Sequence, residues 1–146
     1  MNVQKMAGHL IRRLNQSSTH IFVNHMQEAG FDLTPVQFAA LDTIASNPGI
    51  DQAGVAAKIA YDRATIGGVI DRLEHKGYVA RSVSTRDRRA RDVRLTDRGQ
   101  ALYDQVLPLV NAQKDDMLGA LSIDERATFL QLASKALGQD RNQDPS

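Results

Sequence analysis

The residues of this 146-residue chain that are best suited to chemistry are arginines in its middle. Seven of its thirteen arginines fall between Arg81 and Arg98, although the net charge is only +1. Residues 58–98 hold eleven Lys and Arg against six Asp and Glu, a local net charge of +5, while the rest of the chain carries −4. Because guanidinium groups bind phosphates and guanine edges, a local basic block is typical of nucleic-acid binding. The charge distribution therefore predicts a DNA-binding face.

The densest part of this block is the run Thr85–Arg91. An arginine on a thin loop can enter the electronegative minor groove while its neighbours hold phosphates. An aspartate within such a loop subtracts attraction for DNA, so we interpret it as an internal strut that orients an arginine. The alternative is a solvated loop, which is disfavoured because clustered like charges repel one another without an anionic partner. The predicted DNA-binding residues of the loop are Arg86, Asp87, Arg88, Arg89 and Arg91.

Catalytic and metal chemistry find little support in the same sequence. No nucleophile elbow, phosphate-binding loop or HExxH spacing is present, so an enzyme is the disfavoured alternative class. The chain has no cysteine, which excludes disulfides, thiolate-zinc sites and a cysteine nucleophile. Its four histidines form no tight metal triplet, although His20 and His25 could bind zinc adventitiously. We expect no catalytic residues, no metal site and no cofactor.

Periodicity and capping signals predict mainly helical structure with a small β-hairpin. Apolar residues three and four apart predict six helices. Alternation of period two in Tyr78–Val83 and Asp92–Leu95 predicts two strands joined by a basic tip, Ser84–Arg91. The helices are expected at Val3–Ala29, after the Thr34-Pro35 cap, after Asp51, after Asp62, from Thr96 with a kink at Pro108, and from the Ser122/Glu125 capping box to about Leu137.

Two short helices followed by a hairpin form a winged helix-turn-helix, whose second helix enters the major groove. That helix starts after Asp62 and would bury the stripe Ile66, Val69, Ile70 and Leu73. Each glycine inside a helix costs about 1 kcal/mol relative to alanine, so its glycine pair predicts a surface in close contact with DNA or with a packed helix. On the outward side of this helix, Arg63 can pair with guanine, and Thr65 can reach a base edge or a phosphate. The predicted DNA-binding residues of this helix are Arg63, Thr65, Gly67, Gly68 and Arg72.

Several of these motifs resemble the MarR family of bacterial transcriptional regulators. Asp87-Arg88-Arg89 followed by Val93–Gly99 resembles the family's wing, and Asp71–Val79 resembles the exit of its recognition helix. The opening Thr34–Phe38 matches as well, and the resemblance covers about residues 3–138. It implies a homodimer that binds pseudo-palindromic operator DNA, usually as a repressor.

The resemblance also assigns roles to single residues. Asp87 and Arg89 match the family's Asp-x-Arg wing motif, which makes Arg89 the minor-groove residue. Many relatives have a polar pair such as Thr-Arg where this chain has Gly67-Gly68, which leaves open which bases are read. The absence of cysteine separates the chain from the family's thiol-oxidation peroxide sensors.

We expect one domain with a dimerisation lobe, about residues 3–33 and 100–138, a winged motif at about 34–99, and a disordered tail at 139–146. Apolar stripes near both ends of the chain are longer than the winged motif requires, so they are expected to be covered across a two-fold axis. An intramolecular bundle is the alternative. The residues of these stripes are Met6, Leu10, Leu14, Met117, Leu118, Leu121, Phe129, Leu130 and Leu132.

A possible effector site lies on the first helix. His9, Arg13 and His20 fall within about 40° of one another on a helical wheel, so they could hold an aromatic carboxylate. The resemblance points to such ligands between the two lobes, where His25, Tyr61 and Phe38 are candidate walls. The alternatives are a solvated polar stripe or salt bridges at the dimer interface.

The sequence therefore predicts a homodimeric repressor released by a small hydroxylated aromatic carboxylate. An architectural DNA-binding protein without ligand response is the alternative. No apolar run reaches the ~20 residues of a membrane span and no signal peptide opens the chain, so we expect no membrane partner and a cytoplasmic location.

Overall fold

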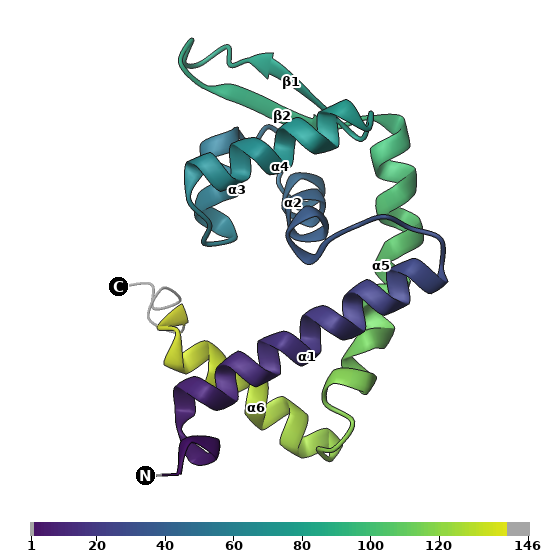
Figure 1. Ribbon diagram of the computed structural model, residues 1–146. Helices are drawn as coiled ribbons and strands as arrows, with labels where there is room; N and C mark the ends of the chain where they lie inside the picture. Colours follow the sequence, from purple (N-terminus) through teal and green to yellow (C-terminus); the bar gives the residue numbers. More distant parts are fainter. Residues whose placement is uncertain (1, 140–146) are drawn as a thin grey trace. The chain divides into compact units, whose positions relative to one another are not determined.

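The computed structural model describes residues 2–139 of the chain (Figure 1). The described residues divide into two compact units after Gln113. The predicted fold class is confirmed, because the described chain contains six α-helices and one two-stranded antiparallel hairpin. The elements are the 3-10 turn η1 (Val3–Lys5), α1 (Ala7–Glu28), α2 (Pro35–Ser46), α3 (Gln52–Lys58), α4 (Arg63–His75), β1 (Val79–Val83), β2 (Arg91–Leu95), α5 (Asp97–Met117) and α6 (Ile123–Ala136).

The helix-turn-helix of the first unit begins each helix at its predicted cap. Thr34 and Gln37 form a capping box at α2, with N–H to side-chain oxygen distances of 3.2 and 3.1 Å. The carboxylates of Asp51 and Asp62 accept backbone N–H groups at 2.7 and 2.8 Å at the starts of α3 and α4. The predicted stripe of α4 is buried in the core, whereas Arg63, Thr65, Gly68 and Arg72 of the same helix are exposed.

The hairpin pairs Val79 with Leu95 and Val83 with Arg91, and it buries Val79 and Val93 against the helices. The Val93 N–H also donates to the Ile50 carbonyl at 3.0 Å, which ties β2 to the loop before α3. The sequence did not predict this contact, because a single bridging residue leaves no alternating pattern. The strand boundaries differ from those predicted by one residue each, since Tyr78 precedes β1 and Arg91 lies in β2.

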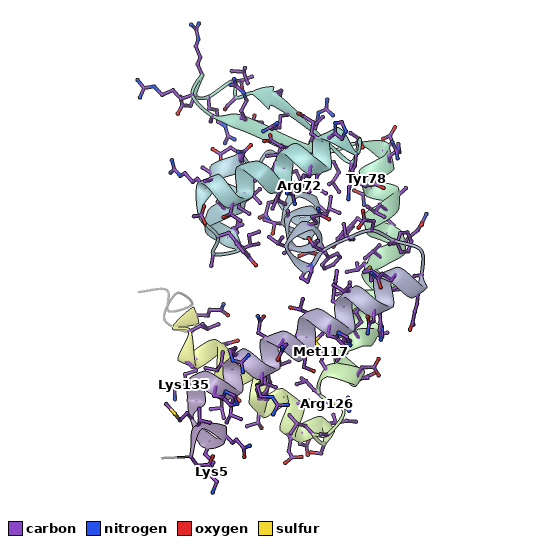
Figure 2. The ribbon with its side chains drawn as sticks, viewed as in Figure 1. Lys5, Arg72, Tyr78, Met117, Arg126 and Lys135 are labelled. Atoms are coloured by element: carbon purple, nitrogen blue, oxygen red, sulfur yellow. The ribbon has the colours of Figure 1, made fainter. Side chains whose placement is uncertain are left out.

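The end of the hairpin is joined tightly to the end of α4. The Thr96 hydroxyl donates to the Gly77 carbonyl at 2.6 Å and accepts the Gly99 N–H at 3.1 Å, which caps α5 as predicted. A Cβ at Gly99 would overlap the carbonyl oxygen of Tyr78. The Arg98 guanidinium lies 5.4 Å from the ring centroid of Tyr78, which is labelled in Figure 2. The helix then continues through Pro108.

The N-terminal prediction of one helix from Val3 is wrong. Met6 has an extended backbone (ψ 133°), so η1 and α1 are separate elements. The physical cause is local, because the Asn2 side chain accepts the Gln4 N–H at 3.0 Å and closes a turn of its own. Within α1 only Phe22 and Met26 are buried, whereas Leu10 is 47% exposed.

The second unit contains the last residues of α5, a turn and α6. The Ser122/Glu125 capping box forms as predicted. Arg126 closes the turn, with its Nε donating to the carbonyls of Leu118 and Leu121 and its Nη1 donating to Asp115 at 2.9 Å. No residue of α6 is buried within the described chain. Most of the predicted tail, residues 140–146, lies outside the described residues.

We expect Gly99→Ala to lower the free energy of unfolding by about 1–3 kcal/mol, because its Cβ would displace the Tyr78 backbone. The matched control is Gly68→Ala, also in a helix, whose Cβ would meet nothing within 4 Å. That control should gain up to about 1 kcal/mol from helix propensity. Thermal unfolding followed by circular dichroism measures both. Equal melting temperatures for the two variants would contradict the close contact at Gly99.

Candidate DNA-binding face

Arginines from the recognition helix and from the wing converge on one hollow. A notch of about 180 Å³ is lined by Arg63 at the start of α4 and by Arg89 and Arg91 of the hairpin, together with Gln52, Ala53 and Ala90. The three arginines are exposed, and none forms an ion pair within residues 2–139. Cations without carboxylate partners attract polyanions most strongly. The structure thus brings together residues that the sequence analysis placed on separate elements.

The wing tip is held by hydrogen bonds to its own backbone. Asp87 Oδ1 accepts the Arg89 N–H at 2.9 Å, and the Asp87 carbonyl accepts the Ala90 N–H at 3.0 Å. Ser84 Oγ accepts the N–H groups of Arg86 and Asp87 at 3.1 and 3.3 Å. Asp87 is therefore a strut, but it acts on the backbone of Arg89 and leaves the guanidinium available.

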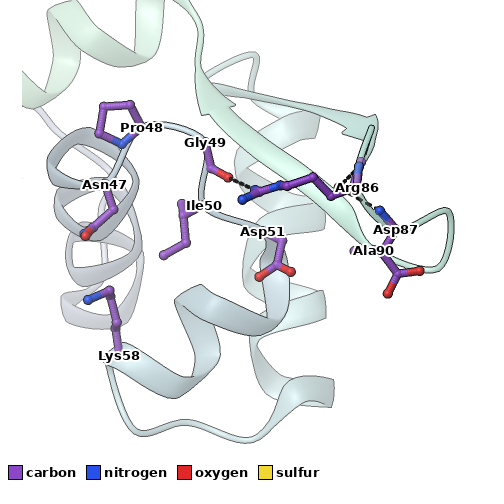
Figure 3. Close-up of a pocket in the computed structure, with 10 residues that line it drawn as sticks. Asn47, Pro48, Gly49, Ile50, Asp51, Lys58, Arg86, Asp87 and Ala90 are labelled. Carbon is purple, nitrogen blue, oxygen red and sulfur yellow. Dashed lines mark hydrogen bonds between the residues drawn. The ribbon is translucent and has the colours of Figure 1, made fainter.

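Arg86 is turned toward the protein. Its Nη2 donates to the Gly49 carbonyl at 3.0 Å, which ties the wing to the loop before α3 (Figure 3). This contact lies in a second hollow, of about 510 Å³, which Lys58 and Asp87 also line. Arg88 is exposed and has no hydrogen bond within the described chain. The geometry thus distinguishes an anchoring arginine from arginines that face solvent.

The predicted residues of α4 also differ in their surroundings. The Thr65 hydroxyl donates to Asp62 Oδ2 at 2.7 Å, so it is engaged in the helix cap, and this bond lowers the pKa of Asp62. A Cβ at Gly67 would lie 3.4 Å from Gln52 Nε2, whereas a Cβ at Gly68 would meet nothing. A packed helix therefore does not account for Gly68 within residues 2–139. Arg72 lies exposed on α4, as labelled in Figure 2.

The contacts of Arg81 were not predicted from the sequence, in which Arg81 counted only as part of the basic block. From β1, its Nη2 donates to Asp71 at 2.6 Å and to Glu74 at 3.0 Å, and its Nε lies 3.3 Å from the second oxygen of Glu74. Its Nη1 donates to Gln52 Oε1 at 3.2 Å. Hydrogen bonding to Arg81 lowers the pKa of Glu74. Two features of the sequence could have indicated these contacts. Asp71 and Glu74 are three residues apart on one helix, and the alternation of β1 places Arg81 on the same side of the strand as the buried Val79.

The three predicted effector residues have different surroundings. His20 lines one of about 510 Å³ on α1 with Arg12, not Arg13, and with Asn15, Gln16, Thr19 and Val23. His20 Nε2 lies 3.1 Å from Asn24 Nδ2. His9 is half-buried, Arg13 is exposed, and neither lines that hollow. The ligand site therefore stays a prediction.

Two of the candidate wall residues, Phe38 and Tyr61, also differ in their surroundings. Phe38 is part of the aromatic core, 6.2 Å from Phe22 and 6.0 Å from Tyr103 between ring centroids. The Tyr103 hydroxyl donates to Asp42 at 2.6 Å, and this bond raises the tyrosine pKa to about 12. Tyr61 is 46% exposed on the surface.

The described residues contain no group of three or more His, Cys, Asp or Glu side chains able to hold a metal ion. Within residues 2–139, no helix combines the length and the apolar character needed to cross a bilayer.

Comparison with known proteins identifies the family of the chain. The profile of the MarR family matches residues 33–90. The transcriptional repressor NicR of Pseudomonas putida is 33% identical over 141 residues, which are 97% of this chain and 88% of NicR. The structure of Bordetella bronchiseptica BpsR, whose DNA binding is regulated by 6-hydroxynicotinic acid, aligns with a TM-score of 0.87 and 30% identity over 93% of this chain and 96% of BpsR.

A mutant MarR of Escherichia coli in complex with operator DNA aligns with a TM-score of 0.82 and 29% identity, covering 89% of this chain and 92% of that one. The similarity to NicR extends over nearly the whole of both sequences, well beyond the helix-turn-helix. The chain therefore belongs to the MarR family and is a transcriptional regulator of the winged helix-turn-helix type.

Proposed function

We propose that the protein is a homodimeric repressor that binds a pseudo-palindromic operator, with α4 in the major groove and Arg89 in the adjacent minor groove. The observation that carries this proposal is the notch in which Arg63 and Arg89 converge without carboxylate partners. Phosphates would supply the missing negative charge, and Asp87 presents the Arg89 side chain outward. NicR is a repressor, and the E. coli MarR complex contains operator DNA, which supports the same assignment.

The dimer is supported by apolar side chains that the single chain leaves uncovered. Leu10 and Leu14 on α1 and Leu130 and Leu132 on α6 are each between 46% and 58% exposed. Exposed apolar residues in such numbers favour burial against a second copy. A two-fold dimer would place its recognition helices about 34 Å apart, one DNA turn, with half-site centres ~10 bp apart.

Footprinting on DNA selected from a random library tests the proposal. We expect protection of a single palindromic site of about 20 bp, because two half-sites one helical turn apart are contacted. Uniform protection along the duplex would instead identify an architectural DNA-binding protein, and no protection would overturn the DNA-binding assignment of this face. Analytical ultracentrifugation of the same sample reports the dimer.

Arg63→Ala and Arg89→Ala should weaken binding differently. Arg63→Ala should cost about 1–3 kcal/mol and relax preference at one base pair in each half-site, since guanine readout is direct. Arg89→Ala should weaken binding while folding and dimerisation stay unchanged, and it should alter preference mainly where the minor groove is narrow. Fluorescence anisotropy on single-base variants of the site measures both. Equal loss on every duplex for Arg63→Ala would reduce it to a phosphate contact.

We also propose that a small aromatic carboxylate relieves DNA binding. BpsR responds to 6-hydroxynicotinic acid, and in this chain His20 lines a hollow beside a basic residue. A carboxylate would pair with arginine, while imidazoles would bind a ring hydroxyl. The ligand can release DNA only by binding the DNA-incompetent state more tightly.

A thermal-shift panel of hydroxylated benzoates, cinnamates and nicotinates tests the effector. We expect at least one compound to raise the melting temperature and to weaken operator binding. Arg13→Met and Arg12→Met form a matched pair, because only Arg12 lines the hollow with His20. Loss of the response in Arg13→Met supports the predicted set His9, Arg13 and His20. A panel without any stabilising compound would contradict the effector.

A further inference from the structure

Arg81 lies where the hairpin, the recognition helix and α3 meet. Its side chain is 23% exposed and its guanidinium bonds with Asp71 and Glu74 of α4 and with Gln52 at the start of α3. Each of these partners is an acceptor, as a guanidinium requires. Arg81 therefore connects three elements of the winged motif through one rigid planar group.

The contact with Gln52 fixes the orientation of an amide. Because arginine offers only donors, the atom of Gln52 that faces Arg81 must be the oxygen, Oε1, at 3.2 Å. The nitrogen Nε2 is then directed elsewhere, beside Gly67, and it has no acceptor within residues 2–139. A Cβ at Gly67 would lie 3.4 Å from Nε2, in ordinary van der Waals contact with this amide. Gly67 thus borders the oriented amide.

Gln52 also lines the notch that holds Arg63, Arg89 and Arg91. Its amide therefore adds a neutral donor, with two N–H groups, to a notch whose other polar side chains are arginines. Phosphate oxygens and base edges accept from such amides. The first helix of a helix-turn-helix crosses the DNA backbone, so its N-terminal residue is placed for this contact.

We propose that Arg81 is a positioning residue for DNA binding, which orients the Gln52 amide so that it donates to the DNA held in the notch. The inference rests on the proposed function. Arg81 itself does not contact DNA, because its donors are engaged by Gln52, Asp71 and Glu74. Its loss should therefore weaken binding without removing an ion pair to phosphate.

The test compares variants on a fluorescein-labelled duplex of about 30 bp, selected by the wild-type protein and long enough for two half-sites. Arg81→Met removes the hydrogen bonds of Arg81 to Gln52, Asp71 and Glu74. Arg81→Met/Glu74→Gln removes them as well, but it keeps the net charge of the wild type because one positive and one negative charge are lost. Gln52→Ala removes only the amide. The control is Arg94→Met, which removes an exposed arginine side chain of β2 that forms no hydrogen bond or ion pair with the described residues. Binding is measured at a temperature at which circular dichroism shows every variant to be folded.

We expect Arg81→Met, its charge-matched double variant and Gln52→Ala to raise Kd at least about fivefold more than Arg94→Met does. For Gln52→Ala and for the charge-matched variant, the slope of log Kd against log salt should equal that of the wild type. A lost phosphate ion pair would instead reduce the slope by about 0.9. Combining Arg81→Met with Gln52→Ala should cost less than the product of the single effects, since both act on one amide.

Three results would overturn the inference. Wild-type affinity in Arg81→Met/Glu74→Gln would show that Arg81 only neutralises acidic residues of α4. A slope reduced by about one unit in that variant would make Arg81 a phosphate contact. Wild-type affinity in Gln52→Ala would remove the amide from the interface. Failure of the wild-type protein to bind any selected duplex would overturn the proposed function itself.

Discussion

Repulsion among arginines is the constraint on which the DNA-binding part of this structure depends. Arg63, Arg89 and Arg91 line one small notch, and no carboxylate of the described chain pairs with them. In free protein their mutual repulsion opposes this arrangement, and water and salt reduce it without removing it. The hairpin must therefore be held against the helices by contacts that do not use up these cations.

Acidic residues of the winged motif make their contacts within the protein, and two of them, Asp71 and Glu74, hold the hairpin to α4 through Arg81. Asp62 caps α4, Asp87 binds the backbone of the wing tip, and Asp71 and Glu74 hold Arg81. Arg86 serves the same purpose through the Gly49 carbonyl. Each carboxylate acts within the protein, so the unpaired guanidinium groups are the ones that face solvent. A hairpin fixed in this way loses less conformational entropy when DNA binds than a free loop would.

Sequence reasoning predicted the features of this motif that depend on residues close together in the chain. The caps at Thr34, Asp62 and Ser122 were located correctly because a cap joins residues three apart. The buried stripe of α4 followed from its 3.6-residue period. The contacts of Arg81 with Gln52 and of Val93 with Ile50 were not predicted, because they join residues 29 and 43 apart and no periodic pattern marks them.

The helical wheel likewise predicts on which side of α1 a residue lies, but not how deeply the residue is buried. It predicts that His9, Arg13 and His20 lie on one side of α1, but a common side is not by itself a pocket. Whether three side chains enclose a ligand depends on what packs over them, and periodicity carries no such information. The hollow at His20 includes Arg12, which the wheel sets about 100° from Arg13.

The two neighbouring glycines of α4 differ in the space beside them. At Gly67 a Cβ would make an ordinary contact with Gln52 Nε2, at 3.4 Å. At Gly68 the space is empty, so the conformational cost of that glycine has no compensation within the described chain. An uncompensated cost at an exposed position is expected where a partner must approach the backbone closely. Because α4 also begins at the arginine notch, the proposed contact with DNA would account for Gly68 and the unpaired cations together.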